Sequence, residues 1–323
     1  MLEKVRAIEV EDVRAARSRI AGTAVRTPLV RLESAPNGLD IWLKLENLQP
    51  INAYKLRGAA NAVALLSDED KRRGVWTISA GNAGQGIAYA ARKAQVPCSV
   101  VAIETAPQAK MDRMRALGAT IVPVPFAVAW KALQEHAFPG MEGTFVHPFD
   151  DYNFIAGHGT MAFEILEDCP EVAAVVASVG GGGLVAGLGS VMKAVKPSVK
   201  VFGVEPETAA PMSVSLAKGS PQTFAGWKPS FIDGAGGQSV FPRMWERMKP
   251  VIDGSLVVTL EETKRAMKVM AEKSRVISEG AGAMPLAAAL SGKVALSEKG
   301  PIVCVVSGGN IDLQKFCELV SAA

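Results

Sequence analysis

The sequence has little cysteine and little histidine, with four cysteines and three histidines among 323 residues. The cysteines lie far apart, no two of them form a C-x-x-C pair, and no pattern of histidines lies near them. These spacings argue against a disulfide framework and against a zinc site, so we predict no metal ligands there. Scattered cysteines of this kind suit a reducing cytosol, and we expect a cytoplasmic protein.

The excess of positive over negative charge is also small, because the formal net charge is only +3, and no long basic run occurs. Nothing in this balance calls for a nucleic-acid partner. The first six residues mix acidic and basic side chains where a signal peptide needs an apolar core, so we expect no export signal.

A long uncharged run is present, but glycine interrupts it. Residues 172–192 carry no charge, and hydropathy alone would favour a membrane span there. The same stretch holds four consecutive glycines and two more soon after them. This pattern is typical of a buried strand, a tight loop and the start of a helix, so we expect no membrane partner.

Apolar residues make up 49% of the sequence, aromatic residues only 6%, and there are 31 glycines. Such a composition favours helices packed on a buried sheet, and the chain is long enough for two core-forming units. Strand-like and helix-like segments alternate, at residues 75–78, 85–93, 98–103, 108–117 and 120–124, with further strands at 173–177, 200–205 and 301–306. The alternation predicts parallel strands joined by helical crossovers.

We therefore predict an α/β architecture of two units, the first inserted into the second. A large cofactor-binding domain comprises residues 1–50 and 146–323, and a small mobile domain comprises residues 51–145. We also predict a helix at residues 9–24 and an irregular stretch at residues 139–159. Because the chain stops soon after Asn310, we expect a short closing helix there and no regulatory domain.

Lys55 lies where the predicted structure changes type. Residues 41–46 alternate apolar and polar side chains like a strand, and residues 58–66 have the composition of a helix. By itself, a lysine at such a junction is most often a solvated surface charge. Three further segments lie at the ends of predicted strands, where ligands collect in parallel sheets: residues 79–82, 180–184 and 307–310.

Four consecutive glycines follow an apolar run and precede a helix-like one, namely Gly180, Gly181, Gly182 and Gly183. Residues without Cβ let backbone amides converge on an anion with a helix dipole behind them, so this loop predicts phosphate binding. An alternative is a dinucleotide site, because Gly181-x-Gly183-x-x-Ala186 matches the fingerprint and Glu205 ends the next strand. A nicotinamide-dependent oxidoreductase is therefore a second hypothesis.

That alternative leaves Lys55, Asn82 and Ser307 unexplained. Pyridoxal phosphate needs an amine for a Schiff base, a cradle for its phosphate, a donor at its phenolic oxygen and a partner at its ring nitrogen. One such cofactor accounts for all three residues together with the glycine loop.

Motifs along nearly the whole chain point in the same direction. They are Arg26-Thr27-Pro28-Leu29, Lys55 with Arg57-Gly58-Ala59, Ser79-Ala80-Gly81-Asn82, Ala156-Gly157-x-Gly159-Thr160, the glycine loop, Gly203-Val204-Glu205-Pro206, Glu279-Gly280-Ala281-Gly282-Ala283 and Ser307-Gly308-Gly309-Asn310. In this order they resemble the serine/threonine dehydratases and serine racemases. These are pyridoxal-phosphate enzymes of the tryptophan-synthase-β fold, also called fold type II, with two parallel-sheet, three-layer domains.

The resemblance implies a role for each site residue. Lys55 would form the Schiff base and later remove the α-proton, with Tyr54 near the cofactor ring. The other cofactor contacts would be Asn82 at the phenolic oxygen, Ser307 at the pyridine nitrogen, and Gly180, Gly181, Gly182, Gly183 and Leu184 at the phosphate. Ser79, Gly81 and Asn82 would hold the carboxylate of an amino-acid substrate. The resemblance also implies a homodimer.

The implied reaction is β-elimination from a β-hydroxy-α-amino acid, such as threonine, serine or a related hydroxy amino acid, giving a 2-oxo acid and ammonia. The hydroxyl of Ser307 at the ring nitrogen does not favour a protonated pyridine. Because the pyridine is then not protonated, elimination is favoured over transamination. A serine-racemase-like activity or another lyase acting on β-substituted amino acids is an alternative. A cofactor-binding protein without turnover is a third class.

Several positions depart from the family's pattern. Ala53 and Ala83 stand where the family has serine and histidine, which removes polar bulk beside the site. Ala80 stands where the racemases have a proton-donating serine, so we expect little racemisation. The family often binds a cation through a glutamate, a backbone carbonyl and an aspartate; Glu205 and Ala209 match the first two, but Pro211 stands at the place of the acid, so we assign no metal ligands and leave a cation near Glu205 open.

The histidines offer little independent chemistry. We expect His136, in a predicted helix, and His147, in a loop, to be structural or solvated. His158 lies in a predicted glycine-rich turn at residues 157–159, where a structural and a catalytic role stay open.

Overall fold

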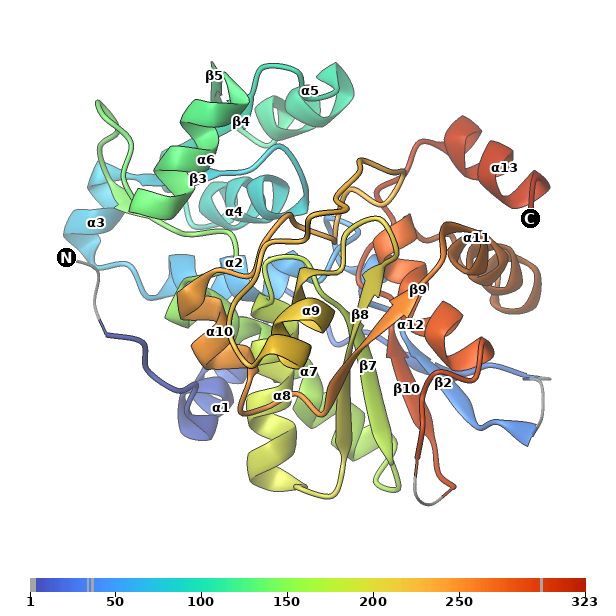
Figure 1. Cartoon of the computed structure of the whole chain (residues 1–323). Coiled ribbons are helices and arrows are strands. Elements are labelled where there is room, and N and C mark those ends of the chain that lie inside the picture. Colours follow the sequence, from blue (N-terminus) through green and yellow to red (C-terminus); the bar gives the residue numbers. More distant parts are fainter. Residues whose placement is uncertain (1–3, 34, 36–37, 297–298) are drawn as a thin grey trace.

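The computed structural model describes residues 4–33, 35, 38–296 and 299–323. Two sheets form the frame of the molecule (Figure 1). The larger has the order β1-β2-β10-β7-β8-β9, with strands Leu29–Arg31, Ile41–Lys44, Ile302–Val305, Ala174–Ser178, Lys200–Pro206 and Gly254–Val258. The smaller has the order β5-β4-β3-β6, with strands Thr120–Val124, Cys98–Ile103, Val75–Ile78 and Thr144–Phe145.

All neighbouring strands run parallel except β1, which pairs antiparallel with β2 at the edge of the larger sheet. The predicted α/β architecture with parallel sheets is therefore confirmed, and the exception is confined to one edge. An antiparallel edge strand needs no helical crossover, so the short connection between β1 and β2 is sufficient.

Helices cover both faces of the larger sheet. One face packs against α7 (Tyr152–Asp168), α8 (Gly183–Val195) and α10 (Pro242–Met248), and the other against α11 (Leu260–Val269), α12 (Gly280–Leu290) and α13 (Leu313–Ser321). Side chains along β7 alternate between these two cores: Val175 and Ala177 join the first, and Ala174 and Val176 join the second. Both faces are buried, which explains the continuous apolar run that β7 shows in the sequence.

The smaller sheet is layered in the same way. One face packs against α2 (Lys55–Ala64), α4 (Asn82–Lys93) and α5 (Gln108–Ala116), and the other against α6 (Phe126–Glu135). The remaining helices are α1 (Val10–Arg19), α3 (Asp68–Arg73), α9 (Pro211–Lys218), a 3-10 turn at Glu46–Leu48 and a π turn at Met270–Ser274. Helix α2 contacts both α4 and α7, and so joins the two layered parts.

Two expectations about helices are wrong. The predicted helix at residues 9–24 ends as α1 at Arg19, and residues 139–159 are not irregular throughout, because α7 begins at Tyr152 and continues through Gly157, His158 and Gly159. A Cβ on Gly157 would collide with the backbone oxygen of Arg57 in α2, and one on Gly159 would lie 2.8 Å from the Gly187 oxygen in α8. These glycines therefore permit close helix packing instead of forming a turn.

The uncharged stretch at residues 172–192 holds β7, the glycine loop and most of α8, as expected. In the part of the chain that the structure describes, no helix is both long and apolar enough to cross a membrane. The strands of the smaller sheet lie within residues 75–145, and those of the larger sheet lie on either side of them. The domain boundaries at residues 50/51 and 145/146, and the mobility of the smaller domain, stay predictions.

Candidate active site

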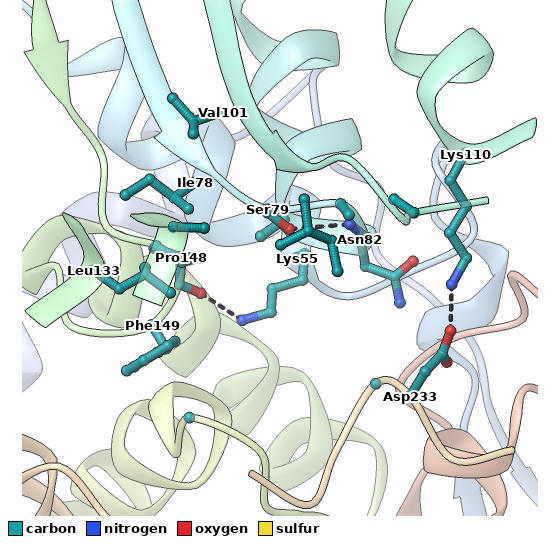
Figure 2. Close-up of a pocket in the computed structure, with 18 of the residues that line it drawn as sticks. Lys55, Ile78, Ser79, Asn82, Val101, Lys110, Leu133, Pro148, Phe149 and Asp233 are labelled. Carbon is teal, nitrogen blue, oxygen red and sulfur yellow. Dashed lines mark hydrogen bonds and ion pairs between the residues drawn. The ribbon is translucent and has the colours of Figure 1, made fainter. Parts of the chain in front are cut away.

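Lys55 is the first residue of α2, and its side chain lies in the pocket drawn in Figure 2. Its Nζ donates a hydrogen bond to the backbone oxygen of Pro148 at 2.7 Å, and lies 5.2 Å from the ring centres of Tyr54 and Phe154. Among the described residues, no carboxylate lies within ion-pair distance of it. Burial without a counter-charge disfavours the ammonium form and lowers the pKa of Lys55 to about 7.

A short antiparallel pairing brings Lys55 close to Ser307. The backbone nitrogen of Tyr54 donates to the Ser307 oxygen at 3.0 Å, and the nitrogen of Gly309 donates to the Asn52 oxygen at 2.9 Å. Ala53, fully buried, forms the bridge between them with Gly308. Residues 52–54, which precede Lys55, are therefore held against the loop that carries Ser307, the predicted partner of the pyridine nitrogen.

The turn at residues 79–82 joins β3 to α4. Asn82 is the first residue of α4 and Gly81 is its N-cap, so the backbone N–H groups of the first turn have no partner within the helix. Ser79, Gly81 and Asn82 line the cavity. The nitrogen of Gly81 donates to Ser79 Oγ at 3.1 Å. A helix N-terminus with two polar side chains is suited to a carboxylate.

Two residues that sequence reasoning gave no role hold the Asn82 side chain. Its Nδ2 donates to Glu279 Oε1 at 2.8 Å, and its Oδ1 accepts from Asn310 Nδ2 at 2.7 Å. Because an amide nitrogen carries two hydrogens, one remains for a further acceptor such as a phenolic oxygen. Burial raises the pKa of Glu279 to about 7, and Asp233 adds to the shift. Both residues lie in motifs quoted above, but spacing alone does not indicate that they meet Asn82.

The glycine loop begins α8, with Gly182 as N-cap at φ +90° and Gly183 and Leu184 in the first turn. A Cβ on Gly181 would collide with the Phe149 ring, and one on Gly182 with the Met248 sulfur. Only glycine fits there, and the loop presents bare backbone at the start of a helix, as a phosphate requires. With Lys55, Asn82 and Ser307 around the same cavity, the residues present fit pyridoxal phosphate.

These residues surround a cavity of about 500 Å³. Of the predicted site residues, Tyr54, Lys55, Ser79, Gly81, Asn82, Gly181 and Ser307 line it directly. Lys110 of α5 pairs with Asp233 across one end of it (Figure 2). The structure therefore brings together residues from four segments that are far apart in the sequence.

Glu205, which the dinucleotide hypothesis requires, lies elsewhere. It is fully buried, and its carboxylate accepts from the nitrogens of Met212 and Ser213 at the start of α9 and from Ser255 Oγ, at 2.7, 2.8 and 2.8 Å. Burial raises its pKa to about 7 against the effect of these bonds. A carboxylate engaged in this way is not available to a ribose.

Pro211 begins α9, and within the described ranges no cluster of acidic, histidine or cysteine side chains could hold a metal.

The histidines lie outside the cavity lining. His147 is buried, with Nδ1 accepting from the Asp150 nitrogen at 2.9 Å, and burial lowers its pKa to about 3. His136 ends α6 beside Asp150, 3.4 Å away. His158 is buried in α7 with its ring 4.6 Å from the Tyr54 ring, and burial holds its pKa far below the usual range. A structural role fits His147 and His136. The imidazole of His158 is uncharged and packs against the Tyr54 ring.

Comparison with known proteins agrees with this site. Residues 20–308 match the family described as "Pyridoxal-phosphate dependent enzyme". The chain is 38% identical to the L-threonine ammonia-lyase of Thermotoga maritima, over 97% of this chain and 78% of that one. It is 36% identical to the catabolic L-threonine dehydratase of Staphylococcus aureus, over 99% and 94%. The crystal structure of serine racemase from Dictyostelium discoideum matches with a TM-score of 0.87 and 32% identity, over 95% and 99%.

The chain therefore belongs to the pyridoxal-phosphate-dependent enzymes, and its fold is of the tryptophan-synthase-β type. It is an enzyme whose cofactor is pyridoxal phosphate, as the motifs predicted. The roles of the single site residues stay predictions, supported by the geometry described above.

Proposed function

We propose that this enzyme is an ammonia-lyase that eliminates water from a β-hydroxy-α-amino acid and releases a 2-oxo acid and ammonia. The observation that carries the proposal is Lys55, an amine at the start of α2 with no carboxylate partner among the described residues and a pKa lowered to about 7. The relatives from Thermotoga maritima and Staphylococcus aureus, both named for threonine, support the reaction class.

Pyridoxal phosphate, when bound, supplies an electron sink for the charge that develops at the α-carbon of the substrate. In the proposed reaction, the first turn of α4, with Ser79 and Asn82, binds the substrate carboxylate and so fixes the α-carbon near Lys55. Lys55, largely neutral above pH 7, accepts the α-proton. Glu279 acts as a positioning residue, because it orients the Asn82 amide.

A turnover assay tests the reaction. We expect the holoenzyme to release ammonia from at least one of threonine, serine, hydroxyaspartate and phenylserine, with a visible absorbance that borohydride bleaches and a label that then maps to Lys55. Ammonia release from none of the four would instead favour a binding protein without turnover. A colourless protein that binds NAD would contradict the cofactor assignment.

Racemisation is a second candidate, because the similar solved structures include serine racemases. It requires a proton donor on the face of the substrate opposite Lys55. Ala80 lines the cavity but has no proton to give. We predict that L-substrate is eliminated with little D-enantiomer, and that Ala80→Ser raises the D fraction at least about fivefold in a chiral assay. Fast L-to-D conversion by the unmodified enzyme would contradict this prediction.

We also propose that the enzyme acts in the cytoplasm as a homodimer. The cysteines support the location, because Cys98, Cys169, Cys304 and Cys317 are all unpaired, which suits a reducing compartment. The family resemblance supports the dimer. Light scattering on the purified holoenzyme checks the dimer, and cell fractionation checks the location.

A further inference from the structure

The cavity has two chemically different ends, on either side of Lys55 (Figure 2). One end is polar and holds Asn82, Lys110 and Asp233. The other, which we name the apolar end, is lined by Ile78, Val101, Ala129, Trp130, Leu133 and Phe149. None of these six side chains carries a charge, and only the indole nitrogen of Trp130 is polar.

The apolar end extends into a hydrophobic core. Ile78, Val101 and Ala129 belong to the buried cluster between the smaller sheet and α6, and Val101 is fully buried. Protein cores are normally close-packed, and a space lined by apolar side chains is costly to leave empty. A space of this kind beside a reactive lysine is therefore suited to an apolar part of a ligand.

The apolar end reaches the turn that is expected to bind the substrate carboxylate. Ile78 directly precedes Ser79, the first residue of the turn expected to bind the substrate carboxylate. The expected phosphate loop and Ser307 follow strands of the other sheet, and of the six residues of the apolar end Phe149 lies against Gly181 of that loop. Ala80 and Ala83 also line the cavity near this turn and add no polar group. A substrate held by its carboxylate at residues 79–82 can direct its side chain along Ile78 into the apolar end.

Aromatic rings mark the outer part of the apolar end. The Trp130 and Phe149 rings each meet the Phe241 ring edge-to-face, with centres 5.3 Å apart in both pairs. Phe126, which is 55% exposed, stacks on Trp130 and also lines the cavity. Aromatic rings favour such edge-to-face and offset contacts, so another ring would find suitable partners here.

We propose that the preferred substrate carries an aromatic ring on its β-carbon, which occupies the apolar end. This inference rests on the proposed elimination: the α-proton and the β-hydroxyl leave as water, and water that enters later releases ammonia and leaves the 2-oxo acid. A methyl group, as in threonine, fills little of the apolar end, whereas a phenyl group fills much more of it. We expect kcat/KM for β-phenylserine to exceed that for threonine by about 100-fold.

Binding of amino acids without a leaving group tests the inference independently of turnover. L-Phenylalanine and L-alanine share the carboxylate and the amine but differ by one phenyl ring. We expect calorimetry on the holoenzyme to give a Kd for L-phenylalanine at least about 10-fold below that for L-alanine. Equal affinities, or tighter binding of L-alanine, would overturn the inference.

A matched pair of variants on α6 tests whether the preference for an aromatic substrate arises at the apolar end. Ala129→Leu adds bulk inside the apolar end, and we expect it to lower the ratio of kcat/KM for phenylserine over serine at least about 10-fold. Val128→Leu, on the exposed side of the same helix, should leave that ratio unchanged. An unchanged ratio in folded Ala129→Leu would overturn the placement. If Ala129→Leu does not fold, the two Kd values of the unmodified enzyme still decide the question.

The outcomes separate this inference from the proposed function. Tight binding of L-phenylalanine without ammonia release from any hydroxy amino acid would overturn the elimination and support the aromatic site. Turnover of threonine or serine, with phenylserine rejected and L-phenylalanine bound weakly, would overturn the aromatic site and support the elimination.

Discussion

Lys44 and Lys55 lie eleven positions apart in the sequence and have opposite surroundings. Lys44, on β2, is fully buried and donates to Glu164 Oε2 at 2.6 Å and to the Thr27 oxygen at 2.7 Å. Lys55 is half-buried at the edge of the cavity, and within the described residues its side chain donates to the Pro148 oxygen alone. Burial lowers the pKa of both amines, but Glu164 and Glu46 oppose the shift at Lys44, and no carboxylate opposes it at Lys55.

The partners of Lys44 form a network that fixes α2. Arg57 bonds Glu46 with Nε at 2.8 Å and Glu164 with Nη1 at 2.7 Å, so two cations share two carboxylates. Arg57 is two residues after Lys55 in the same helix. Pairing therefore decides what a lysine withdrawn from water does: a paired amine stabilises the structure, and an amine without a carboxylate partner and with a pKa near neutral is available for chemistry.

The strongest test of this comparison is to remove the unpaired amine. We expect Lys55→Met to lower kcat for ammonia release at least about 1,000-fold, because both the covalent attachment and the base are lost. We expect the free energy of unfolding, measured by urea denaturation, to change by only about 1 kcal/mol or less, because no buried carboxylate loses its partner. Lys44→Met is the matched control and should retain the visible absorbance of the bound cofactor.

The opposite test is to remove the charge in the network. Glu164→Gln keeps the shape of the side chain but leaves Lys44 and Arg57 with one carboxylate fewer. We expect the free energy of unfolding to fall by about 3–5 kcal/mol, as for other broken buried ion pairs. Urea denaturation measures the loss, and a loss below about 1 kcal/mol would show that the network does not stabilise α2.

A pH measurement reads the state of Lys55 directly. Only the neutral amine attacks the cofactor aldehyde, and with a pKa of about 7 the amine is protonated below pH 7 and neutral above it. The rate at which cofactor-free protein takes up pyridoxal phosphate should therefore rise about tenfold from pH 6 to a plateau above pH 8. A rate that still rises between pH 9 and pH 10 would indicate an ordinary, solvated lysine.

The smallest effect on stability is expected at Glu167, which lies near the end of α7, the helix that also carries Glu164. Like Glu164, Glu167 pairs with two cations, here Arg17 and Arg26, but its side chain is 44% exposed. Water screens these pairs, so Glu167→Gln should lower the free energy of unfolding by about 1 kcal/mol or less in the same urea experiment. A loss as large as that of Glu164→Gln would mean that the number of partners, and not their burial, decides the stability.

Much of the frame could be predicted because it is encoded locally. Strands β3, β4 and β5 have the predicted bounds, since each is a short segment of strand-forming residues between clear helix signals. The glycine loop and the position of Lys55 at a change from loop to helix were predictable for the same reason. Helices α2 and α4 begin earlier than predicted, at Lys55 and Asn82, so both residues lie at helix starts.

The α/β alternation, the glycine loop and the polar residues at the strand ends can be predicted from the sequence, because they depend on neighbouring residues and backbone preferences. Which charged side chains form ion pairs depends on the tertiary structure. It paired Lys44 with Glu164 across 120 positions, whereas Lys55 has no carboxylate partner in the part of the chain that the structure describes. At Gly157 and Gly159 the packing brings neighbouring helices into close contact with α7. Steric and electrostatic contacts between distant segments depend on this packing, which no local sequence pattern specifies.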